Sequence, residues 1–216
     1  MALELEGTRV LCLATDGVEE VELSQPALAL EGFGATVVLA APHMGPIQGF
    51  RHVDKGRSFE VDRLIADVDP AEFDALFLPG GVINADALRT DREAVRVVRS
   101  FFDADKPVAV ICHGAWILLD ANVIAGQTLT SWPSLRTDIR NAGGRWVDET
   151  AHLDGKLLSS RKPADLPVFI EKMVELFAEL PERGQARERW RRGRSRDEVD
   201  QASRESFPAS DSPTHW

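Results

Sequence analysis

The chain has 216 residues, with 25 basic and 35 acidic side chains and therefore a formal net charge of −10. So acidic a chain is a poor candidate for binding nucleic acid nonspecifically, which depends on neutralising phosphates. Its hydrophobic content of 44% excludes disorder throughout, and its length favours one sizeable core over two small domains.

Strand and helix patterns alternate along residues 9–180. Short apolar runs predict buried strands at 9–14, 35–40, 74–78 and 108–111, with weaker ones at 128–130 and 157–159. Apolar spacing predicts helices at 22–31, 92–102, 114–120 and 166–180, with Pro26 in the first turn of the first helix. Because the strands are apolar on both faces, we expect an α/β fold: a doubly wound, mostly parallel sheet with helices on both faces, a flavodoxin-like three-layer sandwich.

The last part of the chain differs in composition. Residues 181–216 hold eight arginines and seven acids but few aliphatic side chains. Such a segment buries too little surface to offset its ordering entropy. We predict an α/β domain over 1–180 and a flexible charged tail over 181–216, with a transient helix around 185–192. A basic docking segment for an acidic partner is the alternative.

The sequence also bears on location. The first residues lack the basic and apolar regions of a signal peptide, and no apolar run approaches the roughly 20 residues of a membrane helix. Cys12 and Cys112 are the only cysteines, and this pattern suits free thiols in a reducing compartment. We expect a soluble, cytoplasmic protein with no membrane partner.

Three loops follow predicted strands, at 16–22, 80–86 and 112–114. Ligands of doubly wound folds bind at the carboxyl ends of the strands, so we expect these loops to form one mouth. The first loop is acidic and unsuited to phosphate, which argues against a dinucleotide site. His43, His52, His152 and His215 show no metal-ligand spacing, and we expect neither a metal nor a cofactor.

Cys112 is the candidate nucleophile. An apolar strand runs directly into Cys112, then His113 and Gly114 open a helix, which is the order of a nucleophile elbow. A thiol at a helix N-terminus is favoured as thiolate, and Gly114 permits the close packing of such a turn. An ordinary buried cysteine is the alternative, and it suits Cys12, which lies mid-strand.

Other residues near the mouth have two interpretations. The amides of Gly80, Gly81 and His113 are candidates for an oxyanion hole, while the two glycines also suit a tight turn with positive φ. Trp116, Trp132 and Pro133 either wall the pocket or fill the core.

Several segments together resemble the ThiJ/PfpI family of the class I glutamine amidotransferase-like superfamily. They are AVICHG, the upstream PGG, DGVEEVEL near the N-terminus, TSWPSLRTDIRNAGGRWVDE at 130–149 and LLSSRKPADLPVFI at 157–170. The resemblance covers about residues 8–180. It implies that Cys112 is the nucleophile and that His113 is its base or proton carrier.

The resemblance also implies roles for carboxylates. A third catalytic acid, matched best by Asp86 in the loop after PGG, orients the histidine from a neighbouring subunit. Many members carry Glu there at slightly different spacing, and an N-cap of the following helix is the alternative for Asp86. This arrangement implies a homo-oligomer, either a dimer or a hexamer.

Glu22 matches the glutamate that contacts the nucleophilic sulfur. A carboxylate would repel a thiolate, so we expect Glu22 to be protonated and to donate a hydrogen bond to the sulfur, which would lower the pKa of Cys112. Glu22 could then act as a general acid or base toward the substrate. Glu19 is either a substrate-binding residue or, like Glu20, an acid favoured by the helix dipole.

Three functions fit these residues. The first is a cofactor-independent cysteine enzyme acting on small reactive carbonyls or glycated substrates, of glyoxalase or deglycase type. The second is an intracellular cysteine peptidase of PfpI type. The third is a non-enzymatic redox-sensing or chaperone-like stress protein with an oxidisable Cys112. The adjacent histidine disfavours an amidotransferase glutaminase, and the short chain favours small substrates.

Overall fold

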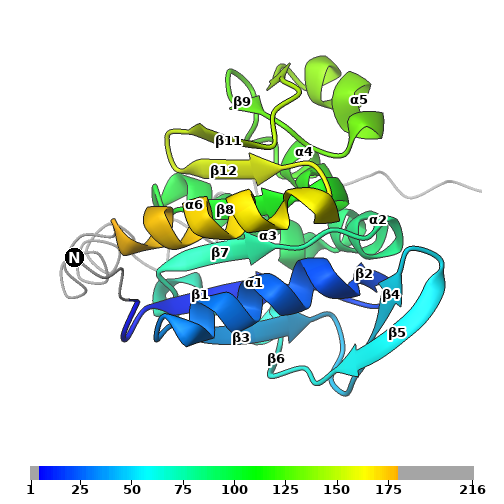
Figure 1. Cartoon of the computed structure of the whole chain (residues 1–216), viewed down its shortest axis with the longest axis vertical. Coiled ribbons are helices and arrows are strands. Elements are labelled where there is room, and N and C mark those ends of the chain that lie inside the picture. Colours follow the sequence, from blue (N-terminus) through cyan, green and yellow to red (C-terminus); the bar gives the residue numbers. More distant parts are fainter. Residues whose placement is uncertain (1–4, 180–216) are drawn as a thin grey trace, which may run out of the picture. The chain divides into compact units, whose positions relative to one another are not determined.

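The computed structural model describes residues 5–179, and the predicted tail at 181–216 lies outside them. A seven-stranded sheet runs through this part of the chain in the order β11-β12-β8-β7-β1-β3-β6 (Figure 1). Within this sheet, β11 and β12 form the one antiparallel pair, and the other described pairs are parallel. The strands are β1 (Arg9–Leu13), β3 (Thr36–Ala41), β6 (Arg63–Leu64), β7 (Ala75–Leu78), β8 (Val108–Ile111), β11 (Ala151–Asp154) and β12 (Leu157–Ser160).

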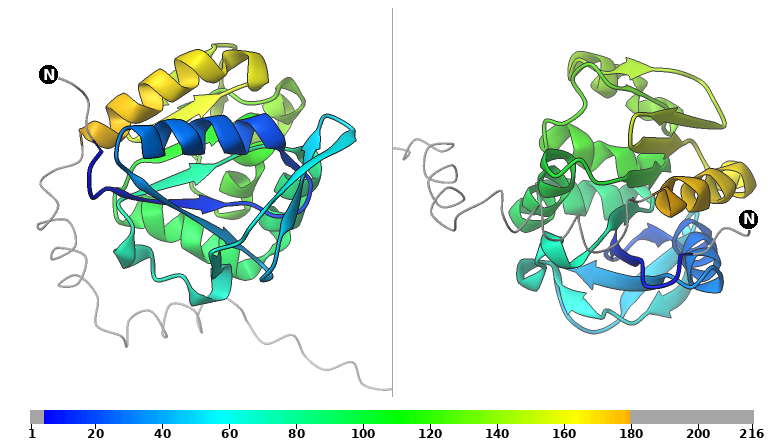
Figure 2. Two further views of the ribbon diagram at one scale, coloured as in Figure 1. Left: turned by 60° about the horizontal axis from the view of Figure 1, so that its bottom comes forward. Right: turned by 90° about the vertical axis from the view of Figure 1, so that its left-hand side faces the viewer.

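Helices cover both faces of this sheet. The helices α1 (Glu20–Gly32) and α6 (Leu166–Ala178) lie side by side on one face, as Figure 1 and the left view of Figure 2 show. The helices α2 (Val82–Thr90), α3 (Arg92–Asp103) and α4 (Trp116–Asp120) lie on the other, and α5 (Arg136–Asn141) packs beside β10. The predicted doubly wound α/β fold is confirmed.

The strands are apolar on both faces because each face meets a different helical layer. In β8, Ala109 and Ile111 belong to the core under α1 and α6, whereas Val108 and Val110 belong to the opposite core. The small Ala109 helps to make room on its face for Phe169, which packs 6.2 Å from Phe77 between ring centroids. Burying a phenylalanine of this kind contributes about 1.5–3 kcal/mol.

The strand order places one switch point near the predicted mouth. From β1 the chain moves outward to β3 and β6, then returns to β7 on the other side of β1. The loops after β1 and β7 therefore diverge at adjacent carboxyl ends, where doubly wound folds bind their ligands. The loop after β8 lies beside them, because β7 and β8 are paired.

Two smaller sheets flank the main one. The strands β2 (Val18–Glu19), β4 (Ile47–Arg51) and β5 (Asp54–Phe59) form one, and β9 (Thr128–Leu129) and β10 (Arg145–Trp146) form the other. The sequence patterns did not predict the β4–β5 hairpin, which extends past the carboxyl end of β1 (Figures 1 and 2). The strand predicted at 128–130 exists, but it pairs with β10 and stays outside the main sheet.

Two helix predictions need correction. Pro26 was placed in a first turn, but α1 starts at Glu20, so the proline lies inside the helix. The helix predicted at 114–120 starts instead as a 3-10 helix (Cys112–Ala115) that leads into the five-residue α4. None of the described helices is long and apolar enough to span a membrane.

Candidate active site

Cys112 occupies a strained turn at the end of β8. Its φ is +61°, in the left-handed region that a non-glycine residue adopts at a cost of order 1–3 kcal/mol. Gly114 makes the turn possible, because a Cβ there would stand 2.6 Å from the carbonyl oxygen of Leu78. The structure thus has the strand, strained turn and helix expected of an elbow, and Cys112 is only 6% exposed.

Glu22 lies directly beside this thiol. Its side chain is fully buried in the first turn of α1, and Oε2 accepts a hydrogen bond from the amide of Gly80 at 3.1 Å. The carboxyl group also interacts with the Cys112 thiol, and its other oxygen, Oε1, is buried without a hydrogen-bond partner in the described part of the chain. Three segments that follow β1, β7 and β8 therefore converge on one carboxyl group.

Burial controls the ionisation of this pair. Burial raises the pKa of Glu22 from its ordinary 4.5 to about 8, and the charge of Glu19 adds to the rise. The expectation of a protonated Glu22 at neutral pH is therefore supported. Burial, followed by the charge that Glu22 carries when ionised, also raises the pKa of Cys112.

The raised thiol pKa corrects two expectations. Glu22 was expected to lower the pKa of Cys112, but its interaction with the thiol raises it. We expected a helix N-terminus to favour the thiolate, but α4 is short and begins four residues after Cys112. The amides of His113 and Gly81 do hydrogen-bond the sulfur and lower its pKa, yet burial outweighs them. The resting group is a neutral thiol, and it needs a base to become a nucleophile.

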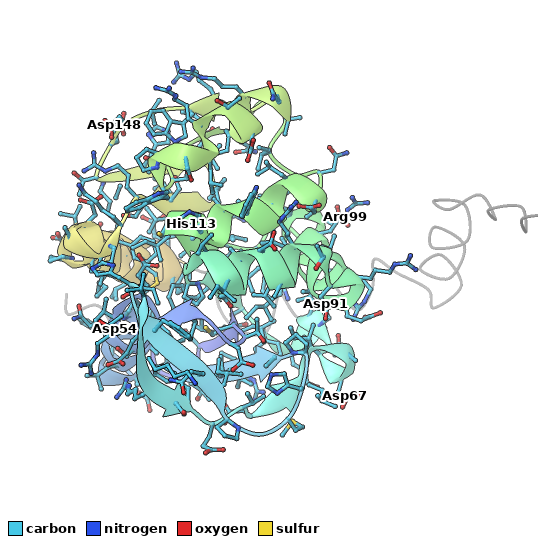
Figure 3. All side chains as sticks on the ribbon, turned by 90° about the vertical axis from the view of Figure 1, so that its right-hand side faces the viewer. Asp54, Asp67, Asp91, Arg99, His113 and Asp148 are labelled. Carbon is cyan, nitrogen blue, oxygen red and sulfur yellow. The ribbon has the colours of Figure 1, made fainter. Side chains whose placement is uncertain are left out.

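His113 is placed to be that base. Its Nδ1 lies 3.4 Å from the sulfur of Cys112, and burial lowers its pKa below the ordinary 6.5. The imidazole is therefore neutral at pH 7 and able to accept a proton. In Figure 3 it lies between Asp54, on the β4–β5 hairpin, and Asp148.

Two tryptophans and a serine surround the imidazole. The ring of Trp132 stacks on it, with centroids 5.6 Å apart and planes 27° apart, and Trp116 approaches to 6.3 Å. Trp132 is 38% exposed, so of the two interpretations it walls the site. Trp116 is half-buried against the core, and Ser134 Oγ lies 3.4 Å from Nε2.

The two glycines after β7 have different tasks. The amide of Gly80 is taken by Glu22, which removes it from the expected oxyanion hole. Gly80 is instead required by close approach, since a Cβ there would stand 2.6 Å from the Cβ of Cys112. Gly81 has φ +91°, the turn conformation expected of one glycine, and its amide joins that of His113 at the sulfur.

Glu19 and Glu20 hold the β4–β5 hairpin. Glu19 accepts from the amide of His52 at 3.0 Å, and Glu20 accepts from the amide of Arg57 at 2.8 Å and from the guanidinium of Arg51. Glu19 still acts on the site through its charge, which helps to raise the pKa of Glu22.

Asp86 is not brought to the other candidates within the chain. It lies inside α2 rather than in a loop, and Gly81 is the N-cap of that helix, so the N-cap alternative for Asp86 is wrong. Its exposed side chain pairs with Arg89, which also contacts Asp120 and stacks 4.6 Å from the Trp116 ring. A depression of about 370 Å³ beside Arg89 and Trp116 lies on this surface.

Two residues near the site were not predicted from the sequence. Asn84 is fully buried, donates to the carbonyls of Pro79 and Gly80, and accepts from the amide of Thr15, so it locks two of the mouth loops together. An asparagine four residues after a Pro-Gly turn is the available sequence signal. Ser134 carried no such signal, because its contact with His113 depends on the tertiary fold.

Cys12, His43 and His152 lie outside this arrangement, and His215 lies outside the described residues. Cys12 is fully buried in β1, and burial raises its pKa far above the ordinary value, as expected of a core thiol. His43 contacts Asp16, and His152 contacts Glu149. Within residues 5–179, no group of three or more His, Cys, Asp or Glu side chains is arranged to hold a metal.

Known proteins resemble this chain in sequence and in fold. The model of the DJ-1/PfpI family matches residues 8–176. Deglycase PfpI of Pyrococcus furiosus is 40% identical over 169 residues, which span 78% of this chain and 99% of that protein. Protein/nucleic acid deglycase 2 of Escherichia coli is 37% identical over 172 residues, or 78% of this chain and 97% of that protein.

Two further relatives extend the comparison. YraA of Bacillus subtilis, named as a candidate cysteine protease, is 33% identical over 169 residues, or 78% of this chain and 98% of that protein. The crystal structure of DJ-1beta of Drosophila melanogaster aligns with a TM-score of 0.72 and 29% identity, covering 79% of this chain and 90% of that one. With matches that span nearly the whole of these proteins, the chain belongs to the DJ-1/PfpI family and is an enzyme of the deglycase and cysteine-protease type.

Proposed function

We propose that this chain is a cofactor-independent cysteine enzyme that acts on reactive carbonyl compounds or early glycation adducts. The observation that carries the proposal is the position of Cys112, held in a strained turn between a carboxyl group and an imidazole that are both neutral at pH 7. An aldehyde needs a nucleophile, a proton donor and a proton acceptor, and these three side chains supply them.

The first step joins Cys112 to the carbonyl carbon. His113 takes the thiol proton at Nδ1 as the sulfur attacks, and the carbonyl electron pair moves onto oxygen. The neutral Glu22 gives that oxygen a proton, and the product is a hemithioacetal. The amide of Gly81 and that of His113 lie at the sulfur and support the charge that develops there.

For methylglyoxal, the next steps are internal proton transfers. The Glu22 carboxylate takes the proton from the carbon bonded to sulfur and returns it to the neighbouring ketone carbon. The hydroxyl proton of the hemithioacetal moves to the ketone oxygen, which leaves a lactoyl thioester. The Glu22 carboxylate then deprotonates a water that attacks the thioester carbon, the carbon–sulfur bond breaks, and His113 returns its proton to the departing sulfur, so that the thiol is restored and lactic acid leaves, losing its proton to solvent. No external oxidant or reductant is needed, because one carbon of the substrate is oxidised as the other is reduced.

The role of Asp86 belongs to this proposal. Its exposed position on α2 suits a residue that reaches the His113 of a neighbouring subunit in a dimer or hexamer. Two reduced cysteines, one of them reactive, suit a cytoplasmic location. A role for Glu19 in contacting substrate is supported only by its place beside Glu22.

A peptidase is the second candidate function. The pairing of Cys112 with His113 is the nucleophile–base contact that peptide hydrolysis uses, and YraA is named for that activity. The same site, in which Cys112 is only 6% exposed, favours small substrates over folded proteins. A third candidate, redox sensing, needs only the oxidation of Cys112 and no histidine.

The deciding experiment is lactate release from methylglyoxal without glutathione. The wild-type chain and Cys12→Ala are expected to turn over alike, because Cys12 lies in the core of β1, whereas Cys112→Ala is expected to be inactive. If the wild type releases no lactate although its Cys112 is alkylated rapidly, the carbonyl proposal is contradicted. A fluorogenic peptide substrate and mass measurement of oxidised Cys112 would then separate the other two functions.

A further inference from the structure

A buried carboxamide lies next to the candidate active site. Asn84 is the third residue of α2, and its side chain is fully buried. Its Nδ2 donates to the carbonyl of Gly80 at 2.9 Å and to the carbonyl of Pro79 at 3.2 Å. Its Oδ1 accepts from the amide of Thr15 at 2.8 Å. Three hydrogen bonds therefore connect this one side chain to the loops after β1 and β7.

The partners of Asn84 fix the direction of each of these hydrogen bonds. A carbonyl oxygen only accepts and a backbone amide only donates, so the NH2 group must face Pro79 and Gly80 and the side-chain oxygen must face Thr15. In the flipped orientation the oxygen would face two carbonyl oxygens, and the NH2 group would face the N–H of Thr15. The backbone around the carboxamide thus sets its orientation.

The carbonyl of Pro79 is one end of the peptide group that contacts Glu22. A trans peptide group is planar, and its carbonyl and its N–H point in opposite directions. In the Pro79–Gly80 peptide the carbonyl accepts from Asn84, while the N–H donates to Oε2 of Glu22 at 3.1 Å. Rotation of this peptide would break both contacts together, so the carboxamide holds the N–H toward the carboxyl group.

The next peptide group along the chain repeats this arrangement at the sulfur. In the Gly80–Gly81 peptide the carbonyl accepts from Asn84, while the N–H of Gly81 lies at the sulfur of Cys112. The amide of Glu19 also donates to this carbonyl, at the longer distance of 3.4 Å. A single carboxamide consequently orients one N–H group at the carboxyl group and one at the thiol.

We propose that Asn84 is a positioning residue for the Glu22–Cys112 pair. Its carboxamide fixes two consecutive peptide groups, with the N–H of one directed toward the carboxyl group and the N–H of the other directed toward the thiol. This inference rests on the proposed function of Glu22 and Cys112 as reacting groups. Asn84 acts through the backbone and takes part in no bond-making step.

The first test is the ionisation of Glu22 in Asn84→Ala, followed without substrate. Infrared spectra recorded over a pH titration report the protonated carboxyl group, and loss of its band in Glu22→Gln assigns it. The amide of Gly80 lowers the pKa of Glu22, so release of that amide is expected to raise this pKa above its wild-type value of about 8. The other titratable groups that face Glu22, Glu19 and Cys112, stay in place. An unchanged or lower pKa would overturn the proposal.

The second test is the alkylation rate of Cys112 by iodoacetamide at pH 7. The N–H of Gly81 lowers the pKa of the thiol, so its release leaves less of the reactive thiolate. We expect Asn84→Ala to slow alkylation about tenfold, as loss of one hydrogen bond to a charged group predicts. Asn84→Ser, whose hydroxyl donates to one carbonyl at most, is expected to react at an intermediate rate. A rate in Asn84→Ala at or above that of the wild type contradicts the proposal.

Gln48→Ala is the matched control. The Gln48 carboxamide also donates to two carbonyls, those of Gly49 and Gly56, but it does so within the β4–β5 hairpin. The variant removes equivalent hydrogen bonds elsewhere, so its Glu22 titration and its alkylation rate are expected to match the wild type. If Gln48→Ala changes both properties as Asn84→Ala does, the effect is a general response to destabilisation and the proposal fails.

A measurement on the wild-type chain decides the point even if the Asn84 variants do not fold. Both Nδ2 protons are hydrogen-bonded inside the fold, so NMR is expected to show slow solvent exchange for each, after assignment through the adjacent amide of Thr15. Rapid exchange of either proton would refute the proposed anchoring. Because none of these measurements uses a carbonyl substrate, failure of methylglyoxal turnover leaves all of them standing.

Discussion

The amide of Gly80 donates a hydrogen bond to Oε2 of Glu22 over 3.1 Å, which joins the end of β7 to the first turn of α1 across 58 positions of sequence. The contact leaves the carboxyl group buried beside the Cys112 thiol, with no hydrogen-bond partner for Oε1 among residues 5–179. The buried carboxyl group is consequently protonated next to the sulfur, and the groups that contact it carry no full charge.

The stability of the protein is expected to fall between pH 4.5 and about 8 because of Glu22. Its pKa is 4.5 in an ordinary setting and about 8 in the fold, so over this range the folded state holds a proton that the unfolded state has lost. Glu22→Gln removes this pH-dependent loss of folding free energy, which is on the order of 5 kcal/mol at most. Urea unfolding at pH 5 and pH 8 should show a smaller decline for Glu22→Gln; parallel declines in both proteins would contradict the assignment.

Turnover of methylglyoxal is expected to depend on pH with two limbs. Burial lowers the pKa of His113 below 6.5, so the acid limb should lie below that value, where the base becomes protonated. The alkaline limb should lie near pH 8, where Glu22 loses the proton that it gives to the substrate. Steady-state kcat/KM from pH 5 to 9 checks both limbs, and an alkaline limb that persists in Glu22→Gln would assign it to another group.

Gly80→Ala is expected to damage both stability and activity. The added methyl group would overlap Glu22 Oε2 and approach the Cβ of Cys112 to 2.6 Å, so the backbone must move. Overpacking of this kind costs about 1–3 kcal/mol, and a displaced nucleophile costs about 100-fold in rate.

Gly32→Ala is the control for this substitution, because a Cβ at Gly32, near the end of α1, meets nothing within 4 Å. It should retain full activity and stability or gain about 0.5–1 kcal/mol. Thermal unfolding and methylglyoxal turnover of the two variants, measured together, decide the point. Normal turnover in Gly80→Ala would show that the Gly80–Glu22 contact does not position the thiol.

Asp86→Asn tests the role of a neighbouring subunit. Asp86 and Asp120 both pair with Arg89 at the surface, and such pairs contribute only about 0–1 kcal/mol to stability. We expect Asp86→Asn to lose at least about tenfold in kcat, while Asp120→Asn remains near the wild type. Sedimentation at the assay concentration completes the test, since a fully active monomer would refute a shared site.

The main sheet and the strained turn that carries Cys112 were predictable because their signals are local. The residues of β8 are buried on both faces, so an apolar run ending at Cys112 was sufficient to place the elbow. Pro26 and Asp86 were misplaced because α1 and α2 begin without a side-chain cap, at Glu20 and Val82, and a helix start without a capping residue gives no signal.

The β4–β5 hairpin was missed for a different reason. Its strands, Ile47–Arg51 and Asp54–Phe59, are largely polar or glycine and show no regular alternation. What holds the hairpin in place comes from elsewhere in the chain, and a single-sequence pattern does not report such contacts. The same applies to Ser134, whose partner His113 is 21 positions away.

Three carboxylates help to attach the hairpin, in addition to the pairing of β2 with β4 and the buried side chain of Ile47. Asp16 accepts a hydrogen bond from the amide of Gln48 in β4. Glu19 accepts from the amide of His52 in the turn, and Glu20 accepts from the amide of Arg57 in β5. The hydrogen bond from Arg51 lowers the pKa of Glu20, so the Glu20 contacts are lost only when that carboxylate is protonated in acid. Acidification should therefore loosen the hairpin at Glu20, in the same first turn of α1 that carries Glu22, before it disrupts the main sheet.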